Sequence, residues 1–211
     1  MRLTVIGATG GIGKEVVRQA LERGHEVTAA VRDPDGLPAG LRERAEVVRA
    51  DVLDPDALAP LVKGRDAVIS ALGTRTRGPD TIQADGARSE VAAMTAAGVR
   101  RLLLVGAAGA VDDPADGPFT RYAVKPLLQR ILRDNFLDLA EGEEIVRRSD
   151  LDWTIVRPPR LLDRPGKGAY RSAVGGLVRG GRSIARADVA TALLDFVGNT
   201  GTHRKAVGIA D

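Results

Sequence analysis

Short apolar runs alternate with amphipathic stretches from the first residue of this sequence, and this alternation restricts the possible folds more than any other feature. Strands are expected at Leu3–Ile6, Val27–Val31, Val47–Val48, Ala67–Ala71, Leu102–Val105 and Trp153–Val156. Between most of these runs, apolar residues recur at helical spacing. Strands that alternate with helices usually form a parallel sheet. The sequence therefore predicts an α/β fold with a doubly wound parallel sheet.

Five segments are expected to be helical. They are a stretch carrying Ile12, Val16 and Ala20, then Pro55–Val62, Thr81–Ala97, a bent region from Pro126 to Ser149, and Ala187–Val197. In the bent region acidic residues precede Arg147 and Arg148, which is the order that the helix dipole favours. We interpret this acidic run as a solvated helix face and not as a paired-carboxylate site; it comprises Asp134, Asp138, Glu141, Glu143 and Glu144.

The length and composition fit one domain. A chain of 211 residues, 44% of them hydrophobic, can form a single α/β domain over residues 1–211. Cysteine is absent, which excludes disulfides, thiolate metal sites and a cysteine nucleophile. No apolar run approaches the roughly 18 residues of a membrane span. A cytoplasmic protein is expected, with no membrane contact. Two long loops, 106–120 and 157–182, follow predicted strands, which is where doubly wound sheets bind substrates.

The charge distribution argues against nucleic-acid binding. The 31 basic residues are interleaved with 28 acidic ones, which leaves a net charge of +3 without a basic patch. Aromatic residues make up only 3% of the chain, so little is available to stack on bases. The two histidines, His25 and His203, have no second ligand at useful spacing, and no metal is expected.

A glycine-rich segment, Gly7-Ala-Thr-Gly10-Gly11-Ile12-Gly13, joins the first predicted strand to the first predicted helix. Glycine is needed where the chain turns sharply, where backbone approaches a pyrophosphate, and where the helix packs tightly on the sheet. The free amides at the start of the helix then meet the phosphates, and Thr9 can add a hydroxyl donor. In this context the segment predicts an NAD(P)-binding domain of the Rossmann type.

The end of the second strand indicates which dinucleotide is bound. An acidic residue about 20 positions beyond the glycines signals NAD, but Arg32 stands there, 19 residues after Gly13. An arginine suits a 2′-phosphate, so NADP(H) is favoured, while Asp33 keeps NAD(H) as an alternative. Asp51 is expected either to accept from the adenine amino group or to cap the helix that follows. Residues 70–74 are mostly small and let the backbone lie beside the cofactor.

These segments resemble, in order and spacing, the atypical short-chain dehydrogenase/reductases of the NAD(P)H-binding type, in particular the biliverdin-IXβ reductase/flavin reductase subgroup. The motifs are the glycine turn, Val31-Arg-Asp, Asp51-Val-Leu, Asp66-Ala-Val-Ile, Leu72-Gly-Thr-Arg75, Gly86-Ala-Arg88, Val91-Ala-Ala-Met94, Arg157-Pro-Pro159 and Gly168-Ala-Tyr170. The resemblance implies that NADP(H) is held by Gly7, Thr9, Gly10, Gly11, Ile12, Arg32, Asp51, Val52, Leu72, Gly73, Thr74 and Arg75. It also places Pro158 and Pro159 beside the nicotinamide.

The sequence departs from that subgroup in the substrate half. Ala108 stands about where the subgroup has a serine near the hydride-transfer site, and Arg160 replaces a histidine. Classical short-chain enzymes use a tyrosine with a lysine four residues on, whereas Tyr122 and Lys125 are three apart and precede Pro126. We therefore do not expect a classical Tyr–Lys dyad. Tyr122 is expected to line the substrate pocket or to pack on the surface.

These features favour an NADP(H)-dependent oxidoreductase that transfers hydride to a planar small molecule such as a flavin or quinone, because such acceptors take their proton from water. Arg160 can stabilise charge on the acceptor, or it is a surface arginine; Tyr170 can cover the ligand, or it packs in the core. The alternatives are a non-catalytic NADP(H)-sensing regulator of the NmrA kind and a specialised biosynthetic reductase or isomerase. A monomer or small homo-oligomer is expected.

Overall fold

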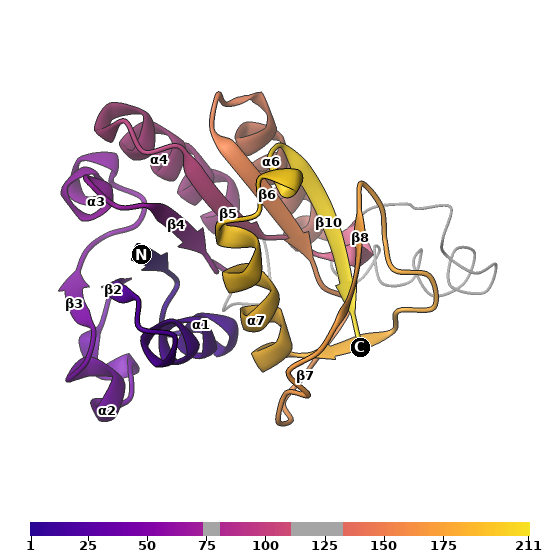
Figure 1. Ribbon diagram of the computed structural model, residues 1–211. Helices are drawn as coiled ribbons and strands as arrows, with labels where there is room; N and C mark the ends of the chain where they lie inside the picture. Colours follow the sequence, from indigo (N-terminus) through magenta and orange to yellow (C-terminus); the bar gives the residue numbers. More distant parts are fainter. Residues whose placement is uncertain (74–80, 111–132) are drawn as a thin grey trace.

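The computed structural model describes residues 1–73, 81–110 and 133–211. Its centre is an eight-stranded sheet (Figure 1). In spatial order the strands are β3 (Glu46–Arg49), β2 (Glu26–Val31), β1 (Arg2–Ile6), β4 (Ala67–Ser70), β5 (Arg101–Val105), β6 (Asp152–Arg157), β10 (Lys205–Ala210) and β8 (Arg171–Val174). All pairings are parallel except β10 with β8. The chain order reverses between β1 and β4, so the predicted doubly wound sheet is confirmed.

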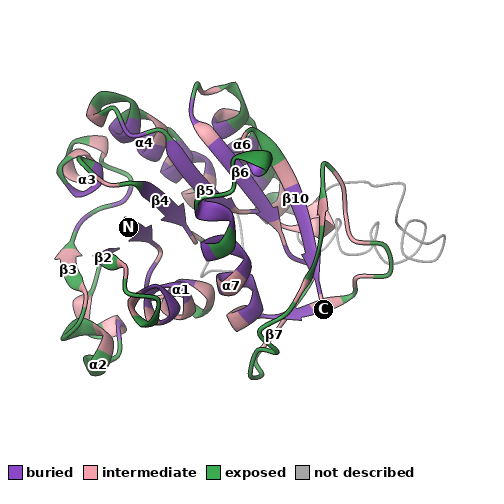
Figure 2. Cartoon of the chain, in the orientation of Figure 1, coloured by how far each residue is buried: buried purple, intermediate pink, exposed green. Residues whose placement is uncertain are grey.

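Helices cover both faces of the sheet. One face carries α1 (Gly11–Glu22) and α7 (Arg186–Val197), and the other carries α3 (Pro55–Val62), α4 (Ile82–Ala97) and α6 (Arg133–Arg148). The strands alternate between the two layers: Leu3 and Val5 face the first, while Ile6 faces the second. Burial is therefore greatest along the central strands (Figure 2). In the described part of the chain, no helix is long and apolar enough to cross a membrane.

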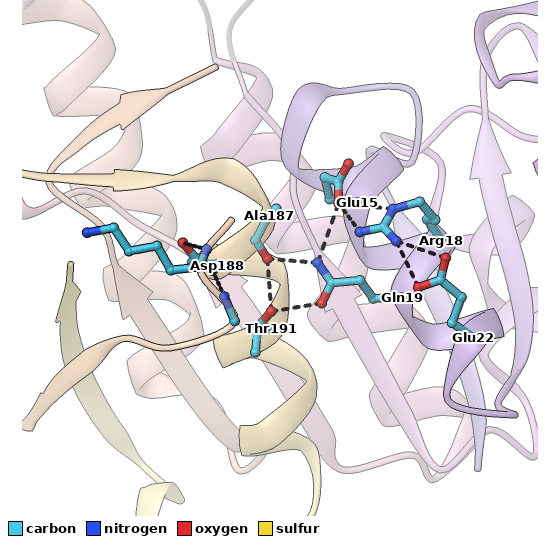
Figure 3. A network of polar contacts seen from close by, with 9 residues as sticks. Glu15, Arg18, Gln19, Glu22, Ala187, Asp188 and Thr191 are labelled. Carbon is cyan, nitrogen blue, oxygen red and sulfur yellow. Dashed lines mark hydrogen bonds and ion pairs between the residues drawn. The ribbon is translucent and has the colours of Figure 1, made fainter. Parts of the chain in front are cut away.

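The packing of α1 on α7 is held by polar side chains as well as by apolar ones (Figure 3). Gln19 of α1 donates to the backbone oxygen of Ala187 at 2.8 Å and accepts from the Thr191 hydroxyl at 2.9 Å. Asp188, which is buried, accepts from the amides of Lys167 and Gly168 at 3.0 and 2.9 Å. These contacts fix the first turn of α7 beside α1.

The region 157–182 is not the long loop that the sequence predicts. It contains β7 (Arg160–Leu162), which pairs with β9 (Ser183–Ala185) in a small separate sheet, and β8 at the edge of the main sheet. Both β7 and β8 are short and lack a buried apolar run, so their sequences carry no strand pattern. The sequence analysis also missed β10, whose Gly208 interrupts the apolar run. Glycine fits there because a Cβ would lie 2.5 Å from the backbone oxygen of Gly176.

The acidic run on α6 is only partly the solvated face that was expected. Asp134, Glu141 and Glu144 are exposed, but Asp138 and Glu143 are buried. Asp138 accepts from the amides of Gln83 and Ala84 at 3.1 and 2.9 Å and so caps the start of α4. The interpretation is wrong for these two residues because α6 packs against α4 and against β6, contacts that the charge pattern does not reveal.

The other predicted helices agree closely. Residues 126–132 of the predicted bent region and residues 111–120 of the predicted loop 106–120 lie outside the described residues. The bounds of α3 are those predicted, because Pro55 fits the first helical position and the Asp54 carboxylate accepts from the Asp56 amide at 2.9 Å. Gly98, at φ 70°, ends α4 in the left-handed region. The short α2 (Ala39–Arg42) was not predicted, and neither were the 3₁₀ turns in the described part of the chain, which are η1 (Pro34–Gly36), η2 (Ala108–Ala110) and η4 (Thr200–Thr202).

Arg101 is a buried arginine at the start of β5. Its guanidinium donates to the backbone oxygens of Phe196 and Val197, which end α7, and to the Thr154 hydroxyl at 2.9 Å. Burial lowers its pKa to about 10. The side chain thus satisfies helix-end carbonyls that otherwise have no intrahelical donor.

Replacing Arg101 with methionine is expected to lower the free energy of unfolding by about 2–4 kcal/mol, because the buried carbonyls lose a charged donor. Urea unfolding measures the change. The neighbouring Arg100 is the matched control: it pairs with Asp152 at 3.1 Å from an exposed position, so Arg100→Met should change little. Equal losses in both variants would contradict the role of Arg101.

Candidate functional site

The glycine-rich segment forms a tight turn between β1 and α1. Gly7 follows β1 with φ 75°, and a Cβ placed on it would lie 2.5 Å from the backbone oxygen of Ala71. The Gly10 amide closes the turn by donating to the Gly7 oxygen at 2.9 Å. A side chain on Gly13, in the first turn of α1, would overlap that same oxygen. Positions 7 and 13 therefore require glycine for steric reasons.

The start of α1 has the character of an anion site. Among the described residues no side-chain hydrogen bond caps the helix at Gly10, and the first turn of α1 contains no acidic residue. The first-turn amides of a helix have no intrahelical partner, and the helix dipole favours negative charge at this end. Bare backbone, held close by glycines, fits the pyrophosphate of a dinucleotide. Ile12 is partly buried against the α1–α7 layer and holds the turn in place.

The segment after β2 places Arg32 and Asp33 at the same edge of the sheet. Both are exposed. The Asp33 carboxylate accepts from the Asp35 amide at 3.1 Å and caps η1. Gly36 in η1 lies against Thr9, since a Cβ on it would be 3.0 Å from the Thr9 methyl group. The loop after β2 and the glycine turn are therefore neighbours.

Asp51 and Val52 follow β3. Asp51 does not cap α3, the structural alternative considered for it, because Asp54 performs that role. The Asp51 side chain instead accepts from the Leu53 amide at 3.0 Å and remains exposed, whereas Val52 is buried in the layer below α3. An exposed carboxylate at the end of β3 remains available to a ligand.

The ends of β4, β5 and β6 complete this edge. Leu72 follows β4 and inserts its side chain where Gly86 of α4 has none, and Gly73 beside it is exposed. The Ala108 amide donates to the Pro158 oxygen at 2.9 Å, which joins the segment after β5 to the one after β6. Pro158 is buried and Pro159 partly buried, while Arg160 is exposed at the first position of β7.

Tyr170 does not lie at this edge. Its hydroxyl donates to Asp195 at 3.1 Å, and its ring packs edge-on against Phe196 with centroids 6.0 Å apart. Asp195 also pairs with Arg23, which follows the last turn of α1. Helix α7 runs from the glycine turn toward the opposite edge of the sheet. The expected role of Tyr170 in the substrate pocket is therefore wrong, and the alternative, in which Tyr170 packs against the core, holds. Thr74, Arg75 and Tyr122 lie outside the described residues.

Two buried carboxylates near the site were not found from the sequence. Glu90 of α4 accepts from the Ser70 hydroxyl at 2.7 Å at the end of β4, and its second oxygen is buried without a partner in the described part of the chain. Burial raises the pKa of Glu90 to about 7. Glu143 of α6 is bound by Arg157 and, at 3.2 Å, by Arg147. A glutamate in an amphipathic helix is ordinarily interpreted as a surface charge. The burial of Glu90 and Glu143 is therefore seen only in the tertiary structure.

A strand, a glycine turn and a helix at the point where a doubly wound sheet reverses its order define a dinucleotide-binding protein. The model of the NAD(P)H-binding family matches residues 7–200. The chain belongs to this family, and its resemblance to the atypical short-chain dehydrogenase/reductases is confirmed.

Relatives and solved structures share the whole fold. A Bacillus subtilis protein named as an uncharacterized sugar epimerase is 28% identical over 217 residues, spanning 100% of this chain and 94% of its own. A candidate NADH-flavin reductase of Streptococcus pneumoniae is 27% identical, with a TM-score of 0.78 and coverage of 100% and 99%. A short-chain dehydrogenase/reductase of Veillonella parvula in complex with NADP superimposes with a TM-score of 0.84 over 100% and 94% at 21% identity, a likeness of fold alone.

The buried Glu90 predicts a pH-dependent stability. Its folded pKa of about 7 exceeds the ordinary value of 4.5, so the folded state binds the proton more tightly. Stability attributable to this group is then lost as the pH rises from about 4.5 through 7. Glu90→Gln keeps an oxygen for Ser70 and removes the titration. Relative to wild type, the unfolding free energy of the variant should rise by about 1–3 kcal/mol between pH 5 and pH 8.

Urea unfolding at the two pH values tests this expectation. Glu144→Gln on the exposed face of α6 is the control and should follow the wild type at both. Parallel stability curves for wild type and Glu90→Gln would contradict the assignment of a raised pKa to Glu90.

Proposed function

We propose that this NAD(P)H-binding protein is an NADP(H)-dependent oxidoreductase that transfers hydride to a planar acceptor such as a flavin or quinone. The observation that carries the proposal is the glycine turn, in which side chains at Gly7 and Gly13 would overlap backbone while the first turn of α1 stays uncapped. Gly7, Gly10, Gly11 and Ile12 hold the pyrophosphate on backbone amides, and Thr9 adds its hydroxyl.

Arg32 gives the preference for NADP(H) in this proposal. It is exposed immediately after β2 and beside the loop that contacts Thr9. Asp33 accepts from the Asp35 amide through one carboxylate oxygen and is also exposed, so NAD(H) stays the alternative at this place. A guanidinium at this place pairs with a 2′-phosphate by charge-assisted hydrogen bonds. The NADP complex of the Veillonella protein is consistent with a fold that accepts this form of the cofactor.

The remaining edge of the sheet is assigned to the rest of the cofactor. Asp51 and Val52 bind the adenine, because the carboxylate is exposed above a buried apolar residue. Leu72 and Gly73 hold the cofactor, as the resemblance also implies for Thr74 and Arg75, and the Pro158–Pro159 pair lines the nicotinamide. Pro158 is held against Ala108 by a backbone hydrogen bond, which fixes this wall of the site.

The acceptor is inferred from what surrounds the end of β5. Ala108 supplies no hydroxyl for proton donation, and the cofactor when bound supplies hydride. An acceptor that takes its proton from water fits this arrangement better than a simple ketone. Arg160 is the candidate group for stabilising negative charge on the acceptor, because it is exposed directly after Pro159. Tyr122 remains a second candidate. The pneumococcal relative, a candidate flavin reductase, supports this acceptor class.

Two alternatives remain beside this proposal. A regulator of the NmrA kind would bind NADP(H) without turnover, and Ala108 is compatible with it. A reductase or isomerase of a biosynthetic pathway is the other, and the Bacillus relative named as a sugar epimerase favours it. The three functions differ in whether NADPH is oxidised: the reductase oxidises it, the regulator only binds it, and an isomerase shows no net loss of it.

Arg32→Ala is expected to weaken NADPH binding by about 1.5–3 kcal/mol and to leave NADH binding nearly unchanged, because only NADPH carries the 2′-phosphate. Calorimetric titration of both cofactors measures the difference. Arg44→Ala, at another exposed position, is the control and should alter neither. Similar losses for the two cofactors would remove Arg32 from its assigned place.

Hydride transfer is tested by following NADPH absorbance after FMN or a quinone is added to the pure protein. The rate at which the absorbance falls should be proportional to the enzyme concentration. Arg160→Ala should lower kcat more than it raises KM, because the charge of Arg160 acts on the reacting acceptor. Tight NADPH binding without turnover of any acceptor in a broad panel would favour the regulator. Epimerisation of a sugar nucleotide with no net NADPH loss would favour the isomerase.

A further inference from the structure

Arg186 lies across the start of α1. It is the first residue of α7, and its stem packs against Gly11, the first residue of α1. A Cβ on Gly11 would lie 2.6 Å from Nε and 2.7 Å from Cδ of Arg186. The sequence analysis assigned Gly11 to backbone contact with the pyrophosphate. In the structure the missing side chain also makes room for an arginine from the far end of the chain.

The guanidinium of Arg186 is incompletely paired. Its Nε forms an ion pair with Asp163 at 3.2 Å, and the Asp163 side chain is 83% exposed. Its Nη1 is buried and has no hydrogen-bond partner within the described residues. A buried donor without an acceptor costs free energy, and a guanidinium donor costs more than a neutral one. The Arg186 side chain as a whole keeps 30% of its surface exposed, so the position favours an additional anionic acceptor from outside.

The place of Arg186 is fixed by its neighbours. The backbone oxygen of Ala187 accepts from Gln19 of α1, and Asp188 holds the amides of Lys167 and Gly168 (Figure 3). The residue before Arg186 ends β9, which pairs with β7. An arginine anchored on both sides loses little further entropy on binding an anion, so this contact is preorganised.

We propose that Arg186 is a side-chain ligand of the cofactor pyrophosphate. The inference rests on dinucleotide binding at the glycine turn, and it adds a cation to a site otherwise built from backbone amides and the Thr9 hydroxyl. The side chain that carries this unpaired donor packs through its Nε and Cδ on Gly11, the first residue of α1, whose first turn has no cap among the described residues. A planar guanidinium suits phosphate oxygens because it can donate two parallel hydrogen bonds.

This assignment joins the cofactor to the substrate half of the protein. Arg186 follows β9 directly. β9 pairs with β7, and Ser183 of β9 lies opposite Arg160 of β7. Asp163, which holds Nε of Arg186, comes directly after β7. The pyrophosphate would then be bound partly by the small sheet that also carries the candidate acceptor residue Arg160.

The proposal is tested by calorimetric titration of the full chain with NADPH, NADH and adenosine 2′-monophosphate, which lacks the pyrophosphate. Arg186→Gln keeps the stem that packs on Gly11 and removes the charge. We expect its Kd to rise about 10- to 100-fold for NADPH and by the same factor for NADH. Binding of adenosine 2′-monophosphate should change less than twofold. Arg186→Lys, which restores a point charge, should recover part of the loss.

Arg182→Gln is the matched control, since it is an exposed arginine in the same segment, and all three ligands should bind it as they bind wild type. Unchanged dinucleotide affinity in Arg186→Gln would overturn the proposal. A similar loss for adenosine 2′-monophosphate would also overturn it, because the variant would then have disturbed the whole site. Failure of the wild type to bind either dinucleotide would instead contradict the cofactor site itself.

Discussion

The close contact between the start of α1 and the ends of β1 and β4 governs the arrangement of the site. Gly13 lies on the oxygen of Gly7, and Gly7 in turn lies beneath the backbone of Ala71. This packing holds α1 with its uncapped amides toward the edge where β2, β3, β5 and β6 also end. Because those strands are parallel, their following segments converge on one edge, and the candidate cofactor residues from Arg32 to Pro159 share it.

Buried polar groups fix the elements around that contact. Arg101 satisfies the last carbonyls of α7, and Asp138 satisfies the first amides of α4. The two side chains act between elements far apart in sequence, and each supplies partners that a helix end lacks. Glu143 joins Arg157 to α6 just before the Pro158–Pro159 pair. The position of the segment after β6 thus depends on buried charge pairing as well as on apolar packing.

The substrate side differs from the cofactor side in what supports it. The cofactor residues sit on turns held by the large sheet, whereas Arg160 and Arg186 are positioned by the small β7–β9 sheet. A substitution in that sheet can therefore alter acceptor and cofactor binding together.

The sequence by itself determined the parallel sheet, the strand–glycine turn–helix unit and the order of the segments along the ligand edge. These follow from local rules: apolar periodicity, helix caps such as Asp54, and backbone positions where only glycine fits. Tertiary structure decided the rest. Asp138, Glu143 and Glu90 carry the pattern of surface charges. Asp138 becomes buried when α6 packs on α4, and Glu143 and Glu90 when their helices pack on the sheet beside Arg157 and Ser70. Tyr170 moves to the opposite edge because its partner Asp195 lies near the end of α7. Arg186 meets Gly11 across most of the chain, and no local signal encodes a contact between residues so far apart in sequence.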